Sequence, residues 1–401
     1  MLFTGLVKFM KYDFNKVIKR VNTNCFKWDM APTIFKNSGV LPMWVADMDF
    51  KSPPEVIAAL KSRCAHGIFG YGARPDSYYE SFINWAKNRY GFNIKKEEII
   101  FSPGIVPALS LCVAAFTGEG DGVIIQPPVY PPFAGVVKDH GRRVLENNLK
   151  LIDGRYEMDF SDLEIKAKSG AKMMFLCAPH NPAGRVWSQS ELERVSDICL
   201  KHNILLVSDE IHADIVYSGC RHICPASLSK KAAGNIITLM SPSKTFNITG
   251  LSISSAVILN EKLREAFNSH VERLHIGLTN VFGITAFEAA YNKGAPWLNS
   301  LLGYLESNRD YALDYIAGKI PAISAIKPES TFLMWLDFQK LKMKQDKLNE
   351  FIINKARLGL NDGASFGAAG TGFMRLNFAC PRAILTEGLK RLENAVNNTN
   401  K

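Results

Sequence analysis

Short apolar runs alternate with helical patterns along the chain from residue 78 to residue 290. Each run is bounded by Gly, Pro or polar residues, as buried strands usually are. Continuous apolar strands separated by helices are typical of a mainly parallel sheet covered on both faces. The pattern therefore predicts an α/β fold. Its candidate strands are seven segments: 98–101, 122–126, 143–146, 172–177, 204–208, 236–240 and 253–259.

Helical patterns fill the intervals between these strands. Examples are residues 107–116 and 189–202, and a long helical stretch covers 262–318. An earlier helix is expected at 56–64. Ser52 would be its N-cap and two prolines would fall in its first turn.

Both ends of the chain differ from this central region. Residues 11–40 are polar and irregular, which indicates an arm rather than a domain. After residue 318, strands are expected at 330–337 and 373–378 and helices at 348–358 and 382–397. We therefore expect three parts: an arm (1–50) that contributes to the small domain, a large α/β domain (51–290) and a small C-terminal α+β domain (291–401).

Composition is that of an ordinary globular protein, with 47% hydrophobic and 21% charged residues in 401. The sequence contains no apolar run of the length needed for a membrane span. The first ten residues lack the features of a signal peptide, and Met10 is an alternative start to Met1. Eight scattered cysteines, mostly in apolar segments, indicate free thiols in a reducing compartment, hence a cytoplasmic protein.

The net charge of +10 could indicate a protein that binds nucleic acid. Its lysines are scattered, however, and no zinc-finger or RNA-recognition pattern is present, so anionic small molecules are the expected partners. Cys220, His222 and Cys224, with His212 upstream, form the one cluster with metal-ligand residue types. A second ligand pair at similar spacing is missing, and the sequence predicts no metal site.

Four strand ends carry candidate chemistry. Gly104 follows the first strand and opens a helix, whose free N–H groups would form an anion site. The same pattern also makes a plain strand-to-helix turn. Asn181, held between prolines at 179 and 182, would project at the next strand end or form an Asx-turn.

Asp209 ends the very apolar strand 204–208, and a buried acid needs a partner. That partner would be a helix N-terminus or a cationic ring nitrogen. Lys244 follows the strand 236–240 in a loop that Pro242 turns away from the sheet. Beside apolar surface a lysine has a lowered pKa, and its neutral amine can attack a carbonyl. A solvated loop lysine is the alternative.

Together these strand ends provide an anion site, a carboxylate and a lysine. Pyridoxal phosphate needs these three groups: for its phosphate, for its protonated pyridine nitrogen and for its Schiff base. The sequence therefore predicts a pyridoxal phosphate site at this edge of the sheet.

The order of these features resembles that of the fold-type I aminotransferases over nearly the whole chain. The shared features are the turn at Gly104, Tyr130, Asn181-Pro182-Ala183-Gly184, Asp209, Ser241-Pro242-Ser243-Lys244 and Arg375. Four stretches are more similar to the carbon–sulfur lyases of the cystathionine β-lyase, PatB and MalY group: 44–50, 102–107, 179–182 and 209–212. Two departures from the common aminotransferase pattern agree: Ser252 replaces a phosphate-binding Arg, and His212 replaces a Tyr.

The resemblance implies roles around the cofactor. Lys244 would carry it as a Schiff base and remove the substrate Cα proton, and Asp209 would pair with the pyridinium. Asn181 and His212 would lie near the phenolic oxygen, or His212 would support Asp209. Tyr130 would stack on the ring, with core packing as its alternative. Phosphate contacts would come from Ser241, Ser243, the amides of Gly104, Ile105 and Val106, and Tyr71 of a second subunit.

Arg375 would bind the substrate α-carboxylate through its fork of donors, helped by the backbone of Val45 and Ala46. The shared Tyr71 implies a homodimer. The implied reaction is elimination from cystathionine, cysteine or a related amino acid to give pyruvate, ammonia and a thiol. The alternatives are an aminotransferase of the same fold and a MalY-like regulatory binding protein.

Overall fold

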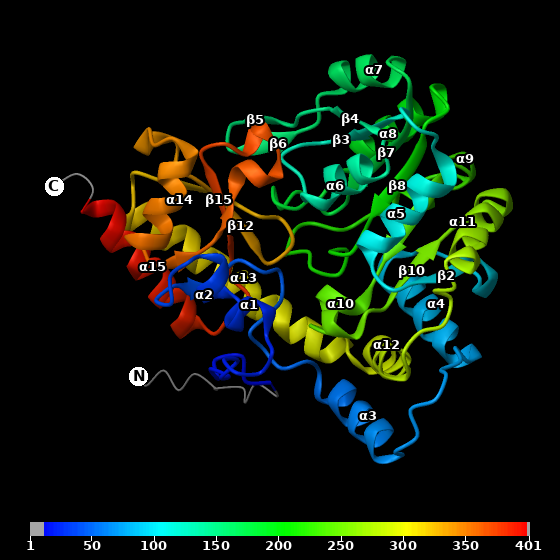
Figure 1. Ribbon diagram of the computed structural model, residues 1–401, viewed down its shortest axis with the longest axis horizontal. Coiled ribbons are helices and arrows are strands. Elements are labelled where there is room, and N and C mark those ends of the chain that lie inside the picture. The colour runs from blue at the N-terminus through cyan, green and yellow to red at the C-terminus, as the bar shows by residue number, and fades with distance from the viewer. Residues whose placement is uncertain (1–11, 399–401) are drawn as a thin grey trace, which may run out of the picture.

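The computed structural model of the protein describes residues 12–398, so both candidate start residues lie outside the described part. Its centre is a seven-stranded sheet with strand order β2-β10-β9-β8-β7-β3-β4 (Figure 1). The strands are β2 (Ile99–Ser102), β3 (Gly122–Ile125), β4 (Arg143–Glu146), β7 (Ala171–Cys177), β8 (Leu205–Asp209), β9 (Ile236–Met240) and β10 (Ser254–Val257).

Six of these strands run in one direction, and β10 runs against both of its neighbours, β2 and β9. The predicted α/β fold with a mainly parallel seven-stranded sheet is confirmed, and each predicted strand overlaps an observed one. The reversed strand matters for function, because its N-terminal end lies where the other strands have their carboxyl ends.

Helices bury both faces of this sheet. Along β7, Met173 and Phe175 face one hydrophobic cluster, whereas Met174 and Leu176 face another. This alternation follows from the two-residue period of a strand. One face is covered by α5 (Ile105–Phe116), α6 (Pro132–Asp139) and α11 (Glu261–Arg273). The other is covered by α4 (Asp76–Tyr90), α7 (Phe160–Lys168), α8 (Gln189–Lys201) and α12 (Val281–Lys293).

The single helical stretch expected at 262–318 is wrong, because three helices occupy it: α11, α12 and α13 (Ala295–Lys319). Asn280 starts α12 as an N-cap, accepting a hydrogen bond from the Gly283 amide. Gly294 separates α12 from α13, and Pro296 lies in the first turn of α13. The boundaries between these helices consist only of polar caps and a Gly-Ala-Pro step. Such short interruptions do not show in the apolar periodicity of the sequence.

The expected N-cap at Ser52 is also wrong. Helix α3 (Pro54–Ala65) begins after Pro53, and no side chain caps it. The Ser52 hydroxyl donates instead to the Asn247 carbonyl at 3.0 Å. Ser52 therefore ties the chain before α3 to the segment that follows Lys244.

A second sheet has the strand order β11-β12-β15-β14. It is packed with α13, α14 (Gln345–Asn354) and α15 (Arg382–Asn397), on the left of Figure 1. The strand predicted at 330–337 begins only at residue 333. The predicted helix 348–358 is displaced toward the N-terminus, since residues 358–359 form a short strand. The strands of this sheet are β11 (Ser324–Ile326), β12 (Leu333–Asp337), β14 (Asn361–Asp362) and β15 (Phe373–Asn377), and the short strand β13 (Leu358–Gly359) lies outside it.

The N-terminal arm pairs with the C-terminal part of the chain in a separate two-stranded sheet. Its strand β1 (Leu41–Pro42) pairs in parallel with β13, and Phe14 packs edge-on against Trp297 of α13 at 5.8 Å. The arm is not wholly irregular, as it contains the short helices α1 (Phe26–Asp29) and α2 (Ala31–Ile34). The expected domain boundaries at residues 50 and 290 remain predictions. Within residues 12–398, every helix is too short or too polar to cross a lipid bilayer.

Candidate active site

Carboxyl ends of parallel strands meet at one edge of the large sheet, and a cavity of about 230 Å³ opens there. Ligands bind at this edge in open α/β sheets. Because β10 is reversed, Ser252 and Ile253 before its first residue also reach this edge. Residues that line the cavity include Ala46, Gly104, Ile105, Val106, Tyr130, Asn181, Asp209, His212, Ser241, Ser243, Lys244, Thr249 and Ser252.

Lys244 lies in a one-turn helix, α10 (Pro242–Thr245), and not in the expected loop. Ser241 caps this turn by accepting from the Ser243 amide at 3.1 Å. The Lys244 amine donates to the Ala46 carbonyl at 2.7 Å. Desolvation lowers the pKa of Lys244 from 10.5 to about 8, against the opposing charge of Asp47. The neutral amine, which is the nucleophilic form, is therefore far more populated near neutral pH than in an ordinary lysine, although the charged form still predominates.

Asp209 is the last residue of β8 and is 3% exposed. Its Oδ1 accepts from the Ile211 amide at 3.1 Å, and no helix starts here, so the N-cap alternative is wrong. Burial raises the pKa of Asp209 to about 7, and the charge of Glu210 adds to the rise. A buried carboxyl in this state gains from a cationic partner. The protonated pyridine nitrogen of pyridoxal phosphate fits that requirement.

An anion site lies at the start of α5. Gly104 is the N-cap residue and Ile105 begins the helix, two residues earlier than predicted. The first amides of a helix have no intrahelical acceptor, and they suit a phosphate. Ser243 and Thr249 also line the cavity, and each carries a hydroxyl group. Thr249 was missed, because it lies in an ordinary polar turn.

The Ser241 hydroxyl is largely committed to the protein itself. It donates to the Ile253 carbonyl at 2.7 Å and accepts from the Ser243 amide. We therefore expect Ser243 to be freer than Ser241 to contact a phosphate. Ser252 occupies the left-handed region with φ 48°, which ends a short turn before β10.

Arg375 lies in the middle of β15 and is 4% exposed. It donates to the Asn181 amide oxygen at 2.9 Å, the Asn361 amide oxygen at 2.7 Å and the Trp44 carbonyl at 3.1 Å. Its Nε is buried and has no hydrogen-bond acceptor among residues 12–398. Burial lowers the pKa of Arg375 to about 10. All its polar partners are neutral, so the buried charge still lacks a carboxylate.

His212 and Tyr130 both line the cavity. Burial lowers the pKa of His212 to about 3, so the imidazole is neutral. Its Nδ1 has no hydrogen-bond partner within the described part of the chain. Burial raises the pKa of Tyr130, which keeps the phenol protonated. Their assignments to the phenolic oxygen and to the ring face stay predictions.

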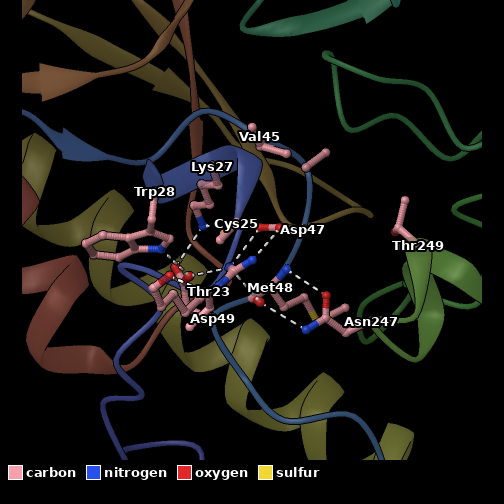
Figure 2. Close-up of polar contacts among 12 residues, drawn as sticks. Thr23, Cys25, Lys27, Trp28, Val45, Asp47, Met48, Asp49, Asn247 and Thr249 are labelled. Atoms are coloured by element: carbon pink, nitrogen blue, oxygen red, sulfur yellow. Dashed lines mark hydrogen bonds and ion pairs between the residues drawn. The ribbon is translucent and has the colours of Figure 1, made fainter. Parts of the chain in front are cut away.

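The loop 44–50 crosses the cavity wall and is held by two asparagines. Asn377 donates to the carbonyls of Val45 and Asp47, each at 2.6 Å. Asn247, with φ 55°, accepts from the Met48 amide at 3.0 Å and donates to the Met48 carbonyl at 2.9 Å. Figure 2 shows Asn247 reaching this loop from the segment after Lys244. Neither asparagine was predicted.

A buried ion cluster supports the same loop from the arm (Figure 2). Lys27, whose side chain is 1% exposed, contacts Asp49 at 2.7 Å and Asp47 at 3.7 Å. Arg20 contacts both aspartates at 2.6 Å, and the Trp28 indole donates to Asp49 at 2.9 Å. The two cations lower the pKa of Asp49 despite its burial. The arm thus fixes the loop electrostatically.

Asp214 anchors the residue next to the lysine and was also missed. Its carboxylate accepts from Thr245 at 2.8 Å and from Trp85 at 3.1 Å, and it accepts from the Tyr90 hydroxyl. Arg89 completes the set with an ion pair at 2.8 Å. This carboxylate therefore holds Thr245, and with it the backbone of Lys244.

Three predicted site residues do not line the cavity of this chain. Tyr71 is 95% exposed, and Val45 contributes its carbonyl to Asn377 rather than to the cavity wall. Arg375 also lies outside the lining and reaches it through Asn181. The phosphate contact expected from Tyr71 requires a second copy of the chain.

Comparison with known proteins places this geometry in a family. The cystathionine β-lyase PatB of Bacillus subtilis is 42% identical over 385 residues, covering 96% of this chain and 100% of the relative. Protein MalY of Escherichia coli is 35% identical, covering 96% and 99%. The crystal structure of a PLP-bound C–S lyase from Staphylococcus hominis superimposes with a TM-score of 0.89 at 35% identity, covering 96% and 98%. Residues 39–392 match the family described as aminotransferase class I and II, and the chain belongs to that family.

Proposed function

We propose that this chain is a pyridoxal phosphate-dependent carbon–sulfur β-lyase. It converts cystathionine, cysteine or a related S-substituted cysteine, with water, to pyruvate, ammonia and a thiol. The observation that carries the proposal is the meeting of Lys244, Asp209 and the anion site of α5 in one cavity. The naming of PatB as a cystathionine β-lyase supports the substrate class.

Pyridoxal phosphate, when bound, supplies an electron-withdrawing ring that stabilises negative charge at the substrate Cα. The residues present fit it, because each of its three polar ends meets a complementary group. Asp209 provides a buried carboxyl, the start of α5 provides free amides and Lys244 provides its amine, and all three line the same cavity.

Arg375 binds the substrate α-carboxylate, using its buried Nε and the charge that its neutral partners leave uncompensated. This contact orients the amino acid with its Cα toward Lys244. The Lys244 amine takes the Cα proton, and its lowered pKa keeps it able to do so near neutral pH. The Cβ–S bond then breaks, and the sulfur leaves with its electron pair and is protonated to the thiol.

An aminotransferase would begin with the same proton removal, so the proton acceptor does not separate the two activities. The printed names of PatB and of the Staphylococcus hominis protein favour the lyase. Ser252, which replaces the phosphate-binding Arg of the common aminotransferase pattern, supports the same choice.

A second copy of the chain completes the site in this proposal. Exposed apolar side chains gather on two loops that Arg74 joins by donating to the Gly277 carbonyl at 2.8 Å. An exposed apolar patch of this kind typically marks an interface. The homodimer places Tyr71 of each copy at the phosphate of the other. The patch comprises Ile68 (67% exposed), Phe69 (55%), Tyr71 (95%), Leu274 (59%) and Leu278 (66%).

The cytoplasm is the compartment that we propose for the enzyme. All eight cysteines lie in the described part of the chain and are free thiols, and five of them are buried. Such thiols persist in a reducing compartment.

Product analysis tests the reaction. Purified enzyme is incubated with L-cystathionine and without a keto acid, and pyruvate, ammonia and homocysteine are quantified. Lys244→Ala should abolish their formation, whereas Lys262→Ala, at an exposed position on α11, should behave as wild type. Amino-group transfer to an added keto acid without pyruvate formation would instead establish the aminotransferase.

Mixing two inactive variants tests the shared site. In a heterodimer of Lys244→Ala and Tyr71→Ala chains, one site has both wild-type residues. Random reassociation gives half heterodimers, so about one quarter of wild-type activity should return. Failure to regain activity, with subunit exchange verified by mass spectrometry, would exclude a role for Tyr71 across the interface.

A further inference from the structure

A second cluster of reactive side chains begins directly after Asp209, the last residue of β8. Glu210, His222 and Cys224 each offer one atom within 4.8 Å of the others. His222 Nε2 lies 2.7 Å from Glu210 Oε2 and 3.8 Å from Cys224 Sγ. All three side chains are buried, with exposures of 4% for His222 and 0% for Glu210 and Cys224. None of them lines the catalytic cavity.

Hydrogen bonding alone leaves this cluster incomplete. The His222–Glu210 contact accounts for one carboxylate oxygen, but Glu210 Oε1 is buried without a hydrogen-bond partner among residues 12–398. A buried carboxylate oxygen in that state carries its full desolvation cost.

Ligand chemistry and spacing fit a zinc-type ion. Thiolate, imidazole and carboxylate are the ligands that zinc prefers. With Zn–S near 2.3 Å and Zn–N near 2.0 Å, a tetrahedral ion separates sulfur and nitrogen ligands by about 3.5 Å and nitrogen and oxygen by about 3.3 Å. The sulfur–nitrogen pair here is already at 3.8 Å. The nitrogen–oxygen pair at 2.7 Å has to open by about 0.6 Å when an ion replaces the shared proton.

Charge balance favours a divalent ion in particular. One thiolate and one carboxylate neutralise a charge of two, and a neutral imidazole completes the set, so the occupied site has no net charge. Neutrality is what a buried site requires. The otherwise unpaired Glu210 Oε1 can supply a fourth contact if the carboxylate binds through both oxygens.

We propose that Glu210, His222 and Cys224 form a structural site for one thiophilic divalent ion of the zinc class. The ion ties the segment 220–224 to the end of β8, directly after Asp209. The ion would thereby also hold Asp209 in position for its contact with the cofactor ring. Sequence spacing concealed this site, because the ligand that completes it is Glu210 rather than His212.

Metal content of the holoenzyme tests the proposal. Wild type, Cys224→Ser and Glu210→Gln are purified without chelator, supplied with zinc, dialysed against metal-free buffer and analysed by mass spectrometry. Cys220→Ser is the matched control, since Cys220 is an exposed thiol four residues away. We expect one zinc per chain in wild type and Cys220→Ser, and loss of zinc in the other two variants.

X-ray absorption at the zinc edge is an independent measurement. It reports which atoms bind the ion and does not depend on cofactor binding. One sulfur at about 2.3 Å and lighter ligands near 2.0 Å are expected. The proposal is overturned by zinc-free wild type after zinc supply, by equal zinc in Cys224→Ser and wild type, or by a shell without sulfur. If Cys224→Ser fails to fold, Glu210→Gln and the absorption spectrum of wild type still decide.

Discussion

Removing the charge of Asp49 should free the loop 44–50 from the arm. The Asp49→Asn side chain keeps its size and can still accept from Trp28, but it no longer balances Lys27. Lys27 is 1% exposed, so its ammonium group cannot turn to water. Its remaining anionic partner is Asp47, at 3.7 Å.

The expected magnitude follows from burial. Breaking a buried ion pair by removing one partner costs about 3–5 kcal/mol. Asp47 retains part of the compensation, so we take the lower end, about 3 kcal/mol, or about 150-fold in the opening equilibrium of the loop. Asp47→Asn is the matched control, because Asp47 and its partner Arg20 are 21% and 20% exposed. Partly exposed pairs contribute at most about 1 kcal/mol, or about fivefold.

Hydrogen exchange measures this opening directly. The Met48 amide donates to Asn247 and the Asp49 amide donates to the Ala379 carbonyl, so both exchange only when the loop opens. Exchange should accelerate by about 150-fold in Asp49→Asn and about fivefold in Asp47→Asn. Equal acceleration in the two variants would refute the reasoning, because it would mean that burial of Lys27 does not set the cost.

Three further results are expected. Arg375→Lys should lower kcat/KM by about 10- to 150-fold, mainly by raising KM, because about 1.5–3 kcal/mol of charge-assisted hydrogen bonding is lost. A fall in kcat alone would contradict carboxylate binding. The rate at which the apoenzyme binds pyridoxal phosphate should be half-maximal near pH 8, because the neutral Lys244 amine forms as pH rises through its lowered pKa of about 8. A midpoint near pH 10.5 would contradict the lowering of this pKa by burial. Thr245→Val should weaken cofactor retention about fivefold, because it removes the hydrogen bond to Asp214, which contributes about 1 kcal/mol. Thr245→Ser keeps the hydroxyl group and should retain the cofactor as wild type does. A valine variant equal to wild type would show that Asp214 does not position the lysine.

Much of the fold was predictable from sequence because apolar strands and helices differ in length and period. The seven strands follow from that pattern, and the carboxyl edge of the six that run in one direction brings Gly104, Asp209 and Lys244 together. The hairpin β5 (Lys150–Ile152) and β6 (Arg155–Glu157) was missed, because most of its residues are exposed and carry no apolar period.

The supports of the site were less predictable than its reactive groups. Asn247 and Asn377 bind loop carbonyls about 200 and 330 positions away, and Asp214 accepts from Trp85, 129 positions earlier in the chain. A polar side chain with a distant main-chain partner has no local sequence signal. Asn247 offered one hint, since asparagine tolerates the left-handed conformation that it adopts three residues after Lys244.

The Ala46 carbonyl gives the Lys244 amine a defined resting position. At 2.7 Å it receives the amine whenever no covalent bond holds it. The neighbouring carbonyls of Val45, Asp47 and Met48 are already occupied by asparagine donors, so the amine returns to one acceptor. Whenever the amine is free during a turnover, it therefore rests at the same place. Because the acceptor is main chain, replacing the side chain at position 46 leaves that resting position intact.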